Sequence, residues 1–389
     1  MANALESELN YVFGDALPQR GGSEPVANGI RWLRMRLPFA LDHINLWLLR
    51  DHEDTPAGRR EGWAIVDCGI DNDDTRAAWE QVFATELQGL PVLRVICTHM
   101  HPDHIGLAQW LTARWQCRLW ISATDWNAAR VASSALGDAH SGHGAADFYA
   151  LHGLNDPKAL AEVRARSNLY ASMVRQVPDR FRRLLHGMRL RIGAHEWQCI
   201  AGYGHAPEHI ALHCQDIDWA PAAPRTREGA AGLWAARRPA GLLIAGDMVL
   251  PRISTNISVY DTEPEANPLP LYLESISAMR TLPADTLVLP SHGKPFTGLH
   301  QRIDQLLRHH DERCAEVLQA CAQAPRSAAE LLPVMFKREL DMHQTTFALG
   351  EAVAHVHALL STGQLREVRR GDGVLRYASV RDAAVPQRR

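Results

Sequence analysis

The stretch THMHPDHIG, residues 98–106, places three histidines and one aspartate within six positions, and it follows the apolar run VLRVIC at 92–97. In an extended segment, side chains two positions apart point to the same side, so His99 and His101 can converge on one ion. Asp103 and His104 can then turn toward a neighbouring ion. Imidazole and carboxylate groups together suit zinc, and iron or manganese also accept them. The stretch therefore predicts a metal centre at the end of a buried strand, with a histidine-rich turn as the alternative.

The pattern His99-Met-His101-Pro-Asp103-His104 resembles the HxHxDH signature of the metallo-β-lactamase superfamily. That family has further ligands at the ends of later strands, and three candidates follow here in the right order. They are His205 in GYGHAPEH, Asp247 in LLIAGDM and His292 in LVLPSHGKPF. Each short match is weak alone, whereas their joint order favours the ligand interpretation.

The resemblance implies that these seven residues are divided between two divalent metal ions, Zn²⁺ first, with Fe or Mn as alternatives. One ion would be held by His99, His101 and His205, the second by Asp103, His104 and His292, with Asp247 bridging the two. Two adjacent ions lower the pKa of a shared water from ~15.7 towards ~7, which gives a hydroxide nucleophile at neutral pH. Asp103, beside that water, is the candidate catalytic residue because it can orient the water and pass a proton onward.

Two positions around this pattern have alternative interpretations. Asp67 in IVDCG matches the family's early aspartate, for which the resemblance implies a supporting role that orients the ligand loops. A turn residue at the end of a strand is the alternative. After His205 the sequence departs from the family's common PGH and has Pro207-Glu208-His209, which leaves the geometry of that loop open. We expect His209 to be an ordinary residue at the start of a strand, with a hydrogen bond near the site as the alternative.

Other polar and aromatic residues can belong either to the site or to ordinary structure. One set can meet an anionic substrate group or lie in surface loops, and the loop interpretation is favoured: Arg252, Asn256, Tyr260 and Lys294. A second set can form a pocket wall or pack in the core, and packing is favoured: Phe148, Tyr149 and His152. Pairs one or two positions apart on a helix do not face each other. We therefore expect surface or packing positions, not metal sites, for His309-His310 and His355/His357.

Strand and helix patterns alternate over the first hundred residues. Strands are predicted at 30–37, 43–51, 63–67 and 92–98, with a helix at 73–87. The alternation predicts an α/β protein, and the resemblance specifies an αβ/βα four-layer sandwich. A single helix is predicted from Asp103 and a strand at 117–122. Residues 122 to about 187 lack strand signals, so they are expected to form a helical insert over the metal site.

Strand patterns resume after this insert and then give way to helices. The strands are predicted at 188–193, 196–202, 209–215, 241–246 and 286–290, and the stretch rich in Pro, Ala, Gly and Arg at 220–241 is a predicted loop. Helices are predicted at 302–322, 327–336 and 345–365, followed by a hairpin that turns at 371–373. The sequence therefore predicts a catalytic domain at 1–298 and a small winged-helix-like domain at 299–389.

The composition shows no strong charge bias. Lys and Arg number 41 and Asp and Glu 44, a net charge of −3, so no positive excess indicates a nucleic-acid partner. The N-terminal residues lack the pattern of a secretory signal, and no apolar run is long enough to span a membrane. The expected location is therefore the cytoplasm. The seven cysteines lack paired CxxC spacing and are expected to be reduced, without a ligand role.

The implied ligand set resembles that of binuclear hydrolases such as glyoxalase II-like thioesterases, lactonases and β-lactamase-like enzymes. The expected function is hydrolysis of a small carboxylic ester, thioester or lactone. A metal-dependent endoribonuclease or another phosphodiesterase is the alternative, because winged-helix domains also occur on such proteins. The helix FALGEAVAHVHALL, however, has no Lys or Arg, whereas a groove-reading helix should present them. Four hairpin arginines are expected on a solvated face: Arg366, Arg369, Arg370 and Arg376.

Overall fold

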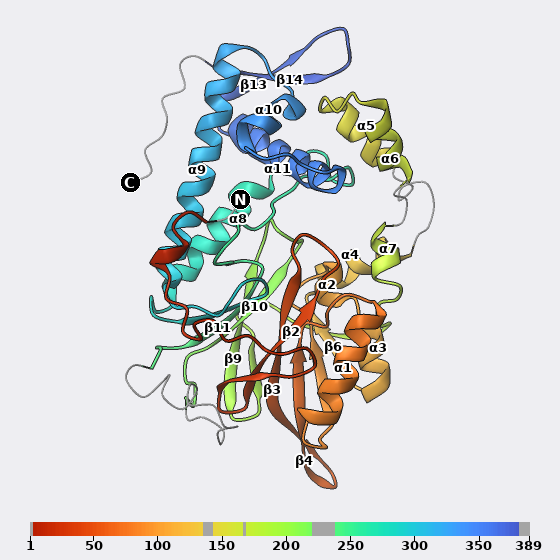
Figure 1. Ribbon diagram of the computed structural model, residues 1–389, viewed down its shortest axis with the longest axis vertical. Helices are drawn as coiled ribbons and strands as arrows, with labels where there is room; N and C mark the ends of the chain where they lie inside the picture. The colour runs from red at the N-terminus through yellow and green to blue at the C-terminus, as the bar shows by residue number, and fades with distance from the viewer. Residues whose placement is uncertain (1–2, 135–142, 166–168, 220–237, 381–389) are drawn as a thin grey trace.

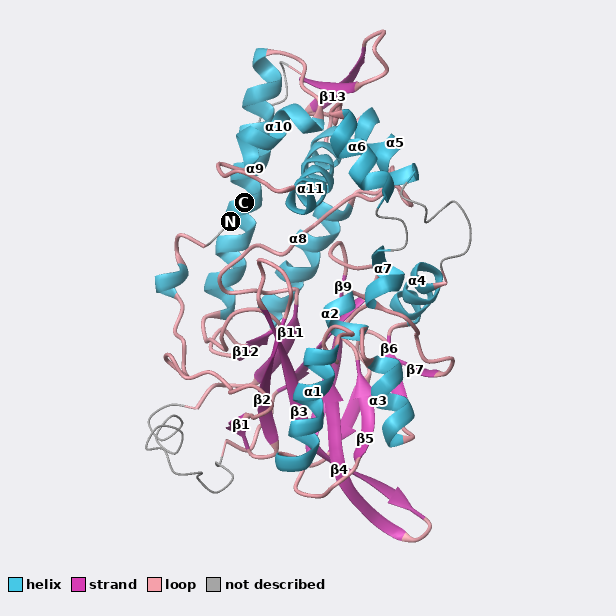
Figure 2. Cartoon of the chain, turned by 45° about the vertical axis from the view of Figure 1, so that its right-hand side comes forward, coloured by secondary structure: helices cyan, strands magenta, loops and turns pink. Residues whose placement is uncertain are grey.

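The computed structural model describes residues 3–134, 143–165, 169–219 and 238–380. Within these residues, two β-sheets pack face to face and helices cover both outer sides (Figure 1, Figure 2). Most of the predicted loop at 220–241 lies outside the described residues.

The first sheet has seven strands, in the order in which they occur along the chain. They are β1 (Glu24–Ala27), β2 (Ile30–Arg36), β3 (His43–Thr55), β4 (Gly58–Val66), β5 (Val92–Ile96), β6 (Arg118–Ile121) and β7 (Phe181–Arg183). Strands β1 to β4 pair antiparallel, and β4 to β7 pair parallel. Parallel neighbours need crossover connections, and helices α1 (Asp73–Thr85) and α3 (Ala108–Trp115) provide two of them.

The second sheet has five strands in the order β12-β11-β10-β9-β8. They are β8 (Arg189–Ile192), β9 (His195–Gly202), β10 (His209–Cys214), β11 (Leu242–Gly246) and β12 (Leu287–Pro290). Strands β11 and β12 pair parallel, and the segment between them contains helix α8 (Pro268–Ala278) and a 3₁₀ turn at Met279–Thr281. The sequence patterns did not indicate α8, whose first residue is a proline.

Three apolar clusters separate the four layers. The cluster between the sheets includes the fully buried Trp32, Trp47 and Trp197. A second cluster joins the outer face of the first sheet to α1, α3 and α4 (Ala123–Ser133), and a third joins the second sheet to α8, α9 (Leu299–Gln323) and α11 (Met342–Ser361). Side chains alternate across a strand, so Leu242 contributes to the inner cluster and Leu243 to the outer one. The predicted αβ/βα sandwich is confirmed.

The predicted insert contains α4, α5 (His143–Leu151), α6 (Pro157–Ala165) and α7 (Leu169–Met173). It also contains β7, so the expectation that it lacks strands was wrong; three residues are too few to show an alternating pattern. Helix α5 packs toward the C-terminal elements, where the backbone N–H of Ala329 donates to His152 O. Phe148, Tyr149 and His152 are buried, as the packing interpretation expected.

The C-terminal region consists of α9, α10 (Ala328–Met335), α11 and the hairpin of β13 (Leu365–Arg369) and β14 (Leu375–Ser379). Helix α9 begins at Leu299, the predicted start of this region. One apolar cluster nevertheless crosses that position, because Leu243 and Ala245 of β11 belong to the same core as Leu306 and Leu349. The division into two domains and the winged-helix comparison stay predictions.

Two further expectations concern membranes and thiols. Among the described residues, none of the helices combines the length and the apolar character needed to cross a membrane. The seven cysteines, all of which lie among the described residues, form no disulfides.

Candidate metal centre

The candidate ligands lie on four segments that each follow a strand, namely β5, β9, β11 and β12, and the first of these segments includes the short helix α2 (Pro102–Ile105). In that order the segments carry His99, His101, Asp103 and His104, then His205, then Asp247, and then His292. The structure brings all seven predicted residues together in two groups, one of four residues and one of three. Within each group, the ligand atoms lie within 4.8 Å of one another.

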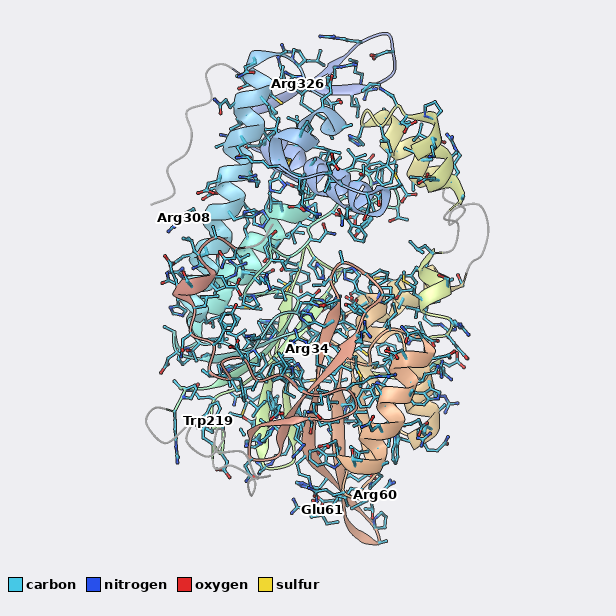
Figure 3. All side chains as sticks on the ribbon, in the orientation of Figure 1. Arg34, Arg60, Glu61, Trp219, Arg308 and Arg326 are labelled. Carbon is cyan, nitrogen blue, oxygen red and sulfur yellow. The ribbon has the colours of Figure 1, made fainter. Side chains whose placement is uncertain are left out.

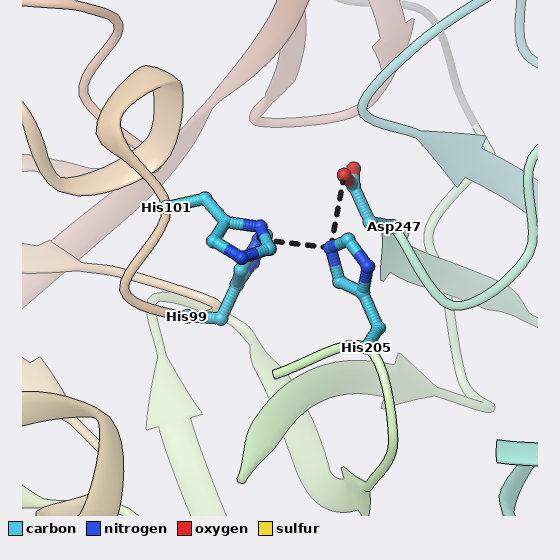
Figure 4. A group of neighbouring side chains, drawn as sticks. All are labelled: His99, His101, His205 and Asp247. Atoms are coloured by element: carbon cyan, nitrogen blue, oxygen red, sulfur yellow. Dashed lines mark hydrogen bonds and ion pairs between the residues drawn. The ribbon is translucent and has the colours of Figure 1, made fainter. Parts of the chain in front are cut away.

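The first group consists of His99, His101, His205 and Asp247 (Figure 4). His99 Nε2 lies 2.9 Å from His101 Nδ1 and 3.3 Å from His205 Nε2. His205 Nε2 in turn lies 3.3 Å from Asp247 Oδ2. Three imidazoles and one carboxylate oxygen thus point at one small volume.

The second group consists of Asp103, His104 and His292. Asp103 Oδ2 lies 3.6 Å from His104 Nε2 and 3.4 Å from His292 Nε2. Asp247 also reaches this group through its other oxygen, because Oδ1 lies 3.5 Å from both of these imidazole nitrogens. Asp247 therefore faces both groups, with one oxygen toward each.

The single helix predicted from Asp103 onward is interrupted in the structure, so this prediction was wrong. The interruption brings the segment that carries the ligands close to the turn after β4. Helix α2 covers Pro102–Ile105, and α3 starts only at Ala108. Between them, a Cβ on Gly106 would lie 2.8 Å from Gly69 O, so only glycine permits this close approach of the two backbones. The backbone N–H of Leu107 donates to the same Gly69 O.

Hydrogen bonds on the far side of several imidazoles fix their orientation. His205 Nδ1 donates to Asn256 O at 2.8 Å, and His292 Nδ1 donates to His43 O at 2.7 Å. His104 Nδ1 lies 2.9 Å from Asp67 Oδ2. Each of these contacts leaves Nε2 as the atom that faces the site, which is the arrangement that metal-binding histidines use.

Asp67 combines both of its predicted interpretations. It lies directly after β4 with a φ of 62°, so it is a turn residue in the left-handed region. Its buried carboxylate also accepts hydrogen bonds from the backbone N–H of Thr98 and from His104. A turn after β4 thus supports the loop after β5.

His209 likewise combines two predicted interpretations. It is the first residue of β10, and its Nε2 accepts a hydrogen bond from the backbone N–H of Asp247 at 3.2 Å. The His209 ring is fully buried, and through this hydrogen bond it holds Asp247, the residue that faces both ligand groups.

Charges inside the centre set the protonation of its members. Burial by itself would lower the pKa of His292, but Asp247 and Asp103 outweigh it and raise this pKa to about 10. Burial would likewise raise the pKa of Asp103, yet His104 and His292 lower it to about 2. His101, for which burial and His205 dominate, has a pKa lowered to about 3. The carboxylates therefore determine the direction of the pKa shift at His292, whereas burial and a neighbouring imidazole determine it at His101.

The donor set fits divalent cations. His104 Nε2 and Asp247 Oδ1 are buried and have no hydrogen-bond partner among the described residues. Buried polar atoms without partners are rare in folded proteins, and an absent ion is one of the usual reasons. Nitrogen and carboxylate oxygen are ligands that zinc and related metals accept.

The structure places the remaining predicted candidates in several ways. Lys294 pairs with Asp15 at 2.9 Å, and Arg252 lies 3.8 Å from Glu6, so both contact the N-terminal segment. Asn256 contributes its backbone oxygen to His205. Tyr260 is 42% exposed.

Sequence reasoning missed several residues that contact the ligand loops. His43 Nε2 accepts from the backbone N–H of Gly293, and Arg34, labelled in Figure 3, donates to Gly293 O at 3.4 Å. Asp125 and Tyr170 hold the segment between His99 and His101. These residues lie on other elements and form no motif with the ligands, so no spacing in the sequence indicated them.

Two family models match the chain. Residues 42–216 match the model described as the metallo-beta-lactamase superfamily, and residues 314–380 match the model described as the metallo-beta-lactamase-like, C-terminal domain.

Individual proteins are similar over nearly the whole chain. A beta-lactamase domain protein from Burkholderia ambifaria, known from its crystal structure, is 51% identical, with 97% of this chain and 100% of that chain covered and a TM-score of 0.85. The metallo-beta-lactamase family protein TTHA1429 from Thermus thermophilus is 24% identical over 91% of this chain and 99% of its own, with a TM-score of 0.68. The protein named "Probable metallo-hydrolase YqjP" of Bacillus subtilis is 21% identical over 335 residues, 84% of this chain and 91% of that protein. The sandwich, the paired ligand groups and the 51% identical relative together establish that the chain belongs to the metallo-β-lactamase superfamily.

Proposed function

We propose that the chain is a binuclear metal-dependent hydrolase that acts on a small carboxylic ester, thioester or lactone. The observation that carries the proposal is the position of Asp247, whose two oxygens face the two ligand groups at 3.3 and 3.5 Å. A carboxylate shared in this way is suited to bridge two neighbouring ions. The printed name of the Bacillus subtilis relative, a metallo-hydrolase, supports the same reaction class.

Each group would hold one divalent ion, with Asp247 between them. Zn²⁺ is the proposed metal because imidazole and carboxylate ligands suit it, and Fe or Mn are the alternatives. When bound, two such ions supply hydroxide at neutral pH, because they lower the pKa of a water from ~15.7 towards ~7.

Asp103 is the proposed catalytic residue. Its side chain is 18% exposed, so it lies at the edge of the centre that solvent reaches. Its Oδ2 lies within 3.6 Å of the two imidazole nitrogens of the second group, so the carboxylate is placed to accept a hydrogen bond from the attacking water. The proton that this water loses would pass onto Asp103, which then releases it to the leaving group or to solvent.

A small substrate is favoured over a nucleic acid by the C-terminal region. Helix α11, the candidate groove-reading helix, packs Leu349, Val353 and Val356 into the apolar core. In the hairpin, Arg369 is 75% exposed, as expected, but the expectation of a solvated Arg376 was wrong: its side chain is only 13% exposed and pairs with Asp372 at 2.8 Å, so its charge is already matched within the hairpin. Charges of both signs also neighbour each other on the β3–β4 hairpin, where Figure 3 labels Arg60 and Glu61.

The test is a hydrolysis screen of metal-loaded protein with esters, thioesters, lactones, phosphodiesters and RNA. We expect turnover of one carboxylic class that disappears on chelation and returns with added metal. Asp247→Asn should remove this turnover, whereas Asp179→Asn, a change of an exposed aspartate, should not. Metal-dependent cleavage of RNA or of phosphodiesters alone would overturn the proposed substrate class. Turnover that survives chelation would overturn the metal chemistry.

A further inference from the structure

Two side chains of the insert hold the backbone between the first two histidine ligands. The N–H of Met100, the residue between His99 and His101, donates to Asp125 Oδ1 at 2.8 Å. The C=O of the same residue accepts a hydrogen bond from the Tyr170 hydroxyl at 2.5 Å. Asp125 lies on α4 and Tyr170 on α7, so both peptide groups next to these ligands are fixed from the insert.

The second oxygen of Asp125 holds the loop of the third histidine. The backbone N–H of Glu208 donates to Asp125 Oδ2 at 2.6 Å, and Thr124 Oγ1 donates to Glu208 Oε2 at 2.8 Å. Glu208 lies three residues after His205, at the position where the sequence departs from the common pattern of the family. One carboxylate thus connects the two loops that carry the three histidines of the first group.

Asp125 is itself held in place. Ser122 caps α4 and its hydroxyl accepts a hydrogen bond from the backbone N–H of Asp125 at 3.1 Å. The Asp125 carboxyl is fully buried, and burial raises its pKa to about 6 although the Met100 and Glu208 N–H groups act in the opposite direction. Burying a carboxylate is unfavourable unless it is hydrogen-bonded. A buried acid with partners on two ligand loops is therefore expected to serve their relative position.

We propose that Asp125 and Tyr170 are positioning residues that fix His99 and His101 relative to His205, so that the insert sets the metal affinity of the first group. This inference rests on the proposed binuclear function. The imidazoles of His99 and His205 approach to 3.3 Å, and metal sites require their ligands to be held within about 0.5 Å of the productive geometry. The second group has no ligand on the Glu208 loop, although it shares the Met100 segment. Its affinity should therefore respond less.

The test is a zinc titration of metal-free protein in competition with a chromophoric chelator, which resolves the two binding steps. Asp125→Asn keeps the size of the side chain but presents an amide N–H to one of the two backbone donors. We expect one binding step to weaken by about 10 to 100-fold, the usual effect of losing a residue that supports a ligand, and the other step by less than about 3-fold. Tyr170→Phe removes one hydroxyl and should weaken the same step several-fold. Asp179→Asn, which loses an exposed partner of Arg130 on α4, is the matched control and should bind as the wild type does.

The outcomes separate this inference from the proposed function. Wild-type protein that binds fewer than two zinc ions contradicts the binuclear proposal itself. Wild-type protein with two ions, together with variants whose two steps are unchanged, overturns the positioning role. Equal weakening of both steps also overturns it, because a general loss of stability would act in that way. If Asp125→Asn does not fold by circular dichroism, Tyr170→Phe decides, and an unchanged titration for that variant rejects the inference.

Discussion

Buried histidines gather in two regions of this protein, at the metal centre and between helices α9 and α11. In the second region, His310 Nδ1 lies 3.1 Å from His355 Nε2, and His355 Nδ1 donates to Glu351 O at 2.8 Å. Both imidazoles are fully buried, as is His99 at the metal centre. Burial and proximity of histidines are therefore common to the two regions.

The regions differ in their carboxylates. Asp247 and Asp103 raise the pKa of His292 to about 10 against the effect of burial, whereas burial lowers the pKa of His355 to about 4. Among the described residues, the clusters able to hold a metal are the two groups of the centre, and they do not include the α9–α11 pair. The metal centre thus places carboxylates among its imidazoles, whereas the contact between His310 and His355 joins two imidazoles and a backbone oxygen.

The largest effect should follow from the change of a carboxylate inside the centre. Asp103→Asn removes a negative charge from the place where hydroxide must form. We expect turnover to fall by more than about 100-fold, beyond the loss usual for supporting residues, and to stay low at saturating metal. Steady-state rates must be read with the metal content and circular dichroism of the same sample. Near-normal turnover with two metals bound would contradict the proposed catalytic role.

A smaller effect is expected one contact further out. Asp67→Asn suits the φ of 62° at this position, because asparagine tolerates the left-handed region. The variant therefore removes the negative charge that faces His104 and Thr98 without straining the backbone. Activity or metal affinity should fall by about 10 to 100-fold, and added metal should restore part of it. Rates measured against zinc concentration test this expectation. A loss that excess metal does not reduce would place Asp67 in the chemistry instead.

The smallest effect concerns the α9–α11 region, where burial raises the pKa of Glu351 from 4.5 to about 7. A carboxyl whose folded pKa is raised contributes stability below its unfolded pKa and loses it as the pH rises through the folded pKa. Between pH 4.5 and 8 the free energy of unfolding of the wild type should therefore fall relative to Glu351→Gln, by on the order of 2 kcal/mol. Urea denaturation at both pH values measures the difference. A difference that does not change with pH would show that Glu351 does not titrate in this way.

Local patterns in the sequence predict an α/β protein and a metal centre at residues 98–106, and the resemblance to a known family added the four-layer sandwich and the full set of seven centre residues. Apolar runs such as 92–97 mark buried strands, and a ligand that directly follows each run lies at the edge of a sheet. Contacts between distant elements leave no such pattern. One example is the hydrogen bond from Met100 to Asp125, which joins a ligand segment to helix α4. Another is the contact of His310 with His355, which joins α9 to α11. The prediction for these two histidines considered only the spacing within one helix. Helix α8 was missed because its prolines, Pro268 and Pro270, resemble a loop, although proline is tolerated in the first turn of a helix.

The central claim, that carboxylates beside the histidines create a two-ion centre, is tested most directly by elemental analysis of three proteins at one free zinc concentration. The wild type and His310→Leu should each contain two metals per chain, because the α9–α11 pair binds none. Asp247→Asn, which lacks the carboxylate that faces both groups, should contain one at most. A wild type that stays near one metal after reconstitution with zinc, iron or manganese, or a His310→Leu protein that loses metal as Asp247→Asn does, would contradict the claim.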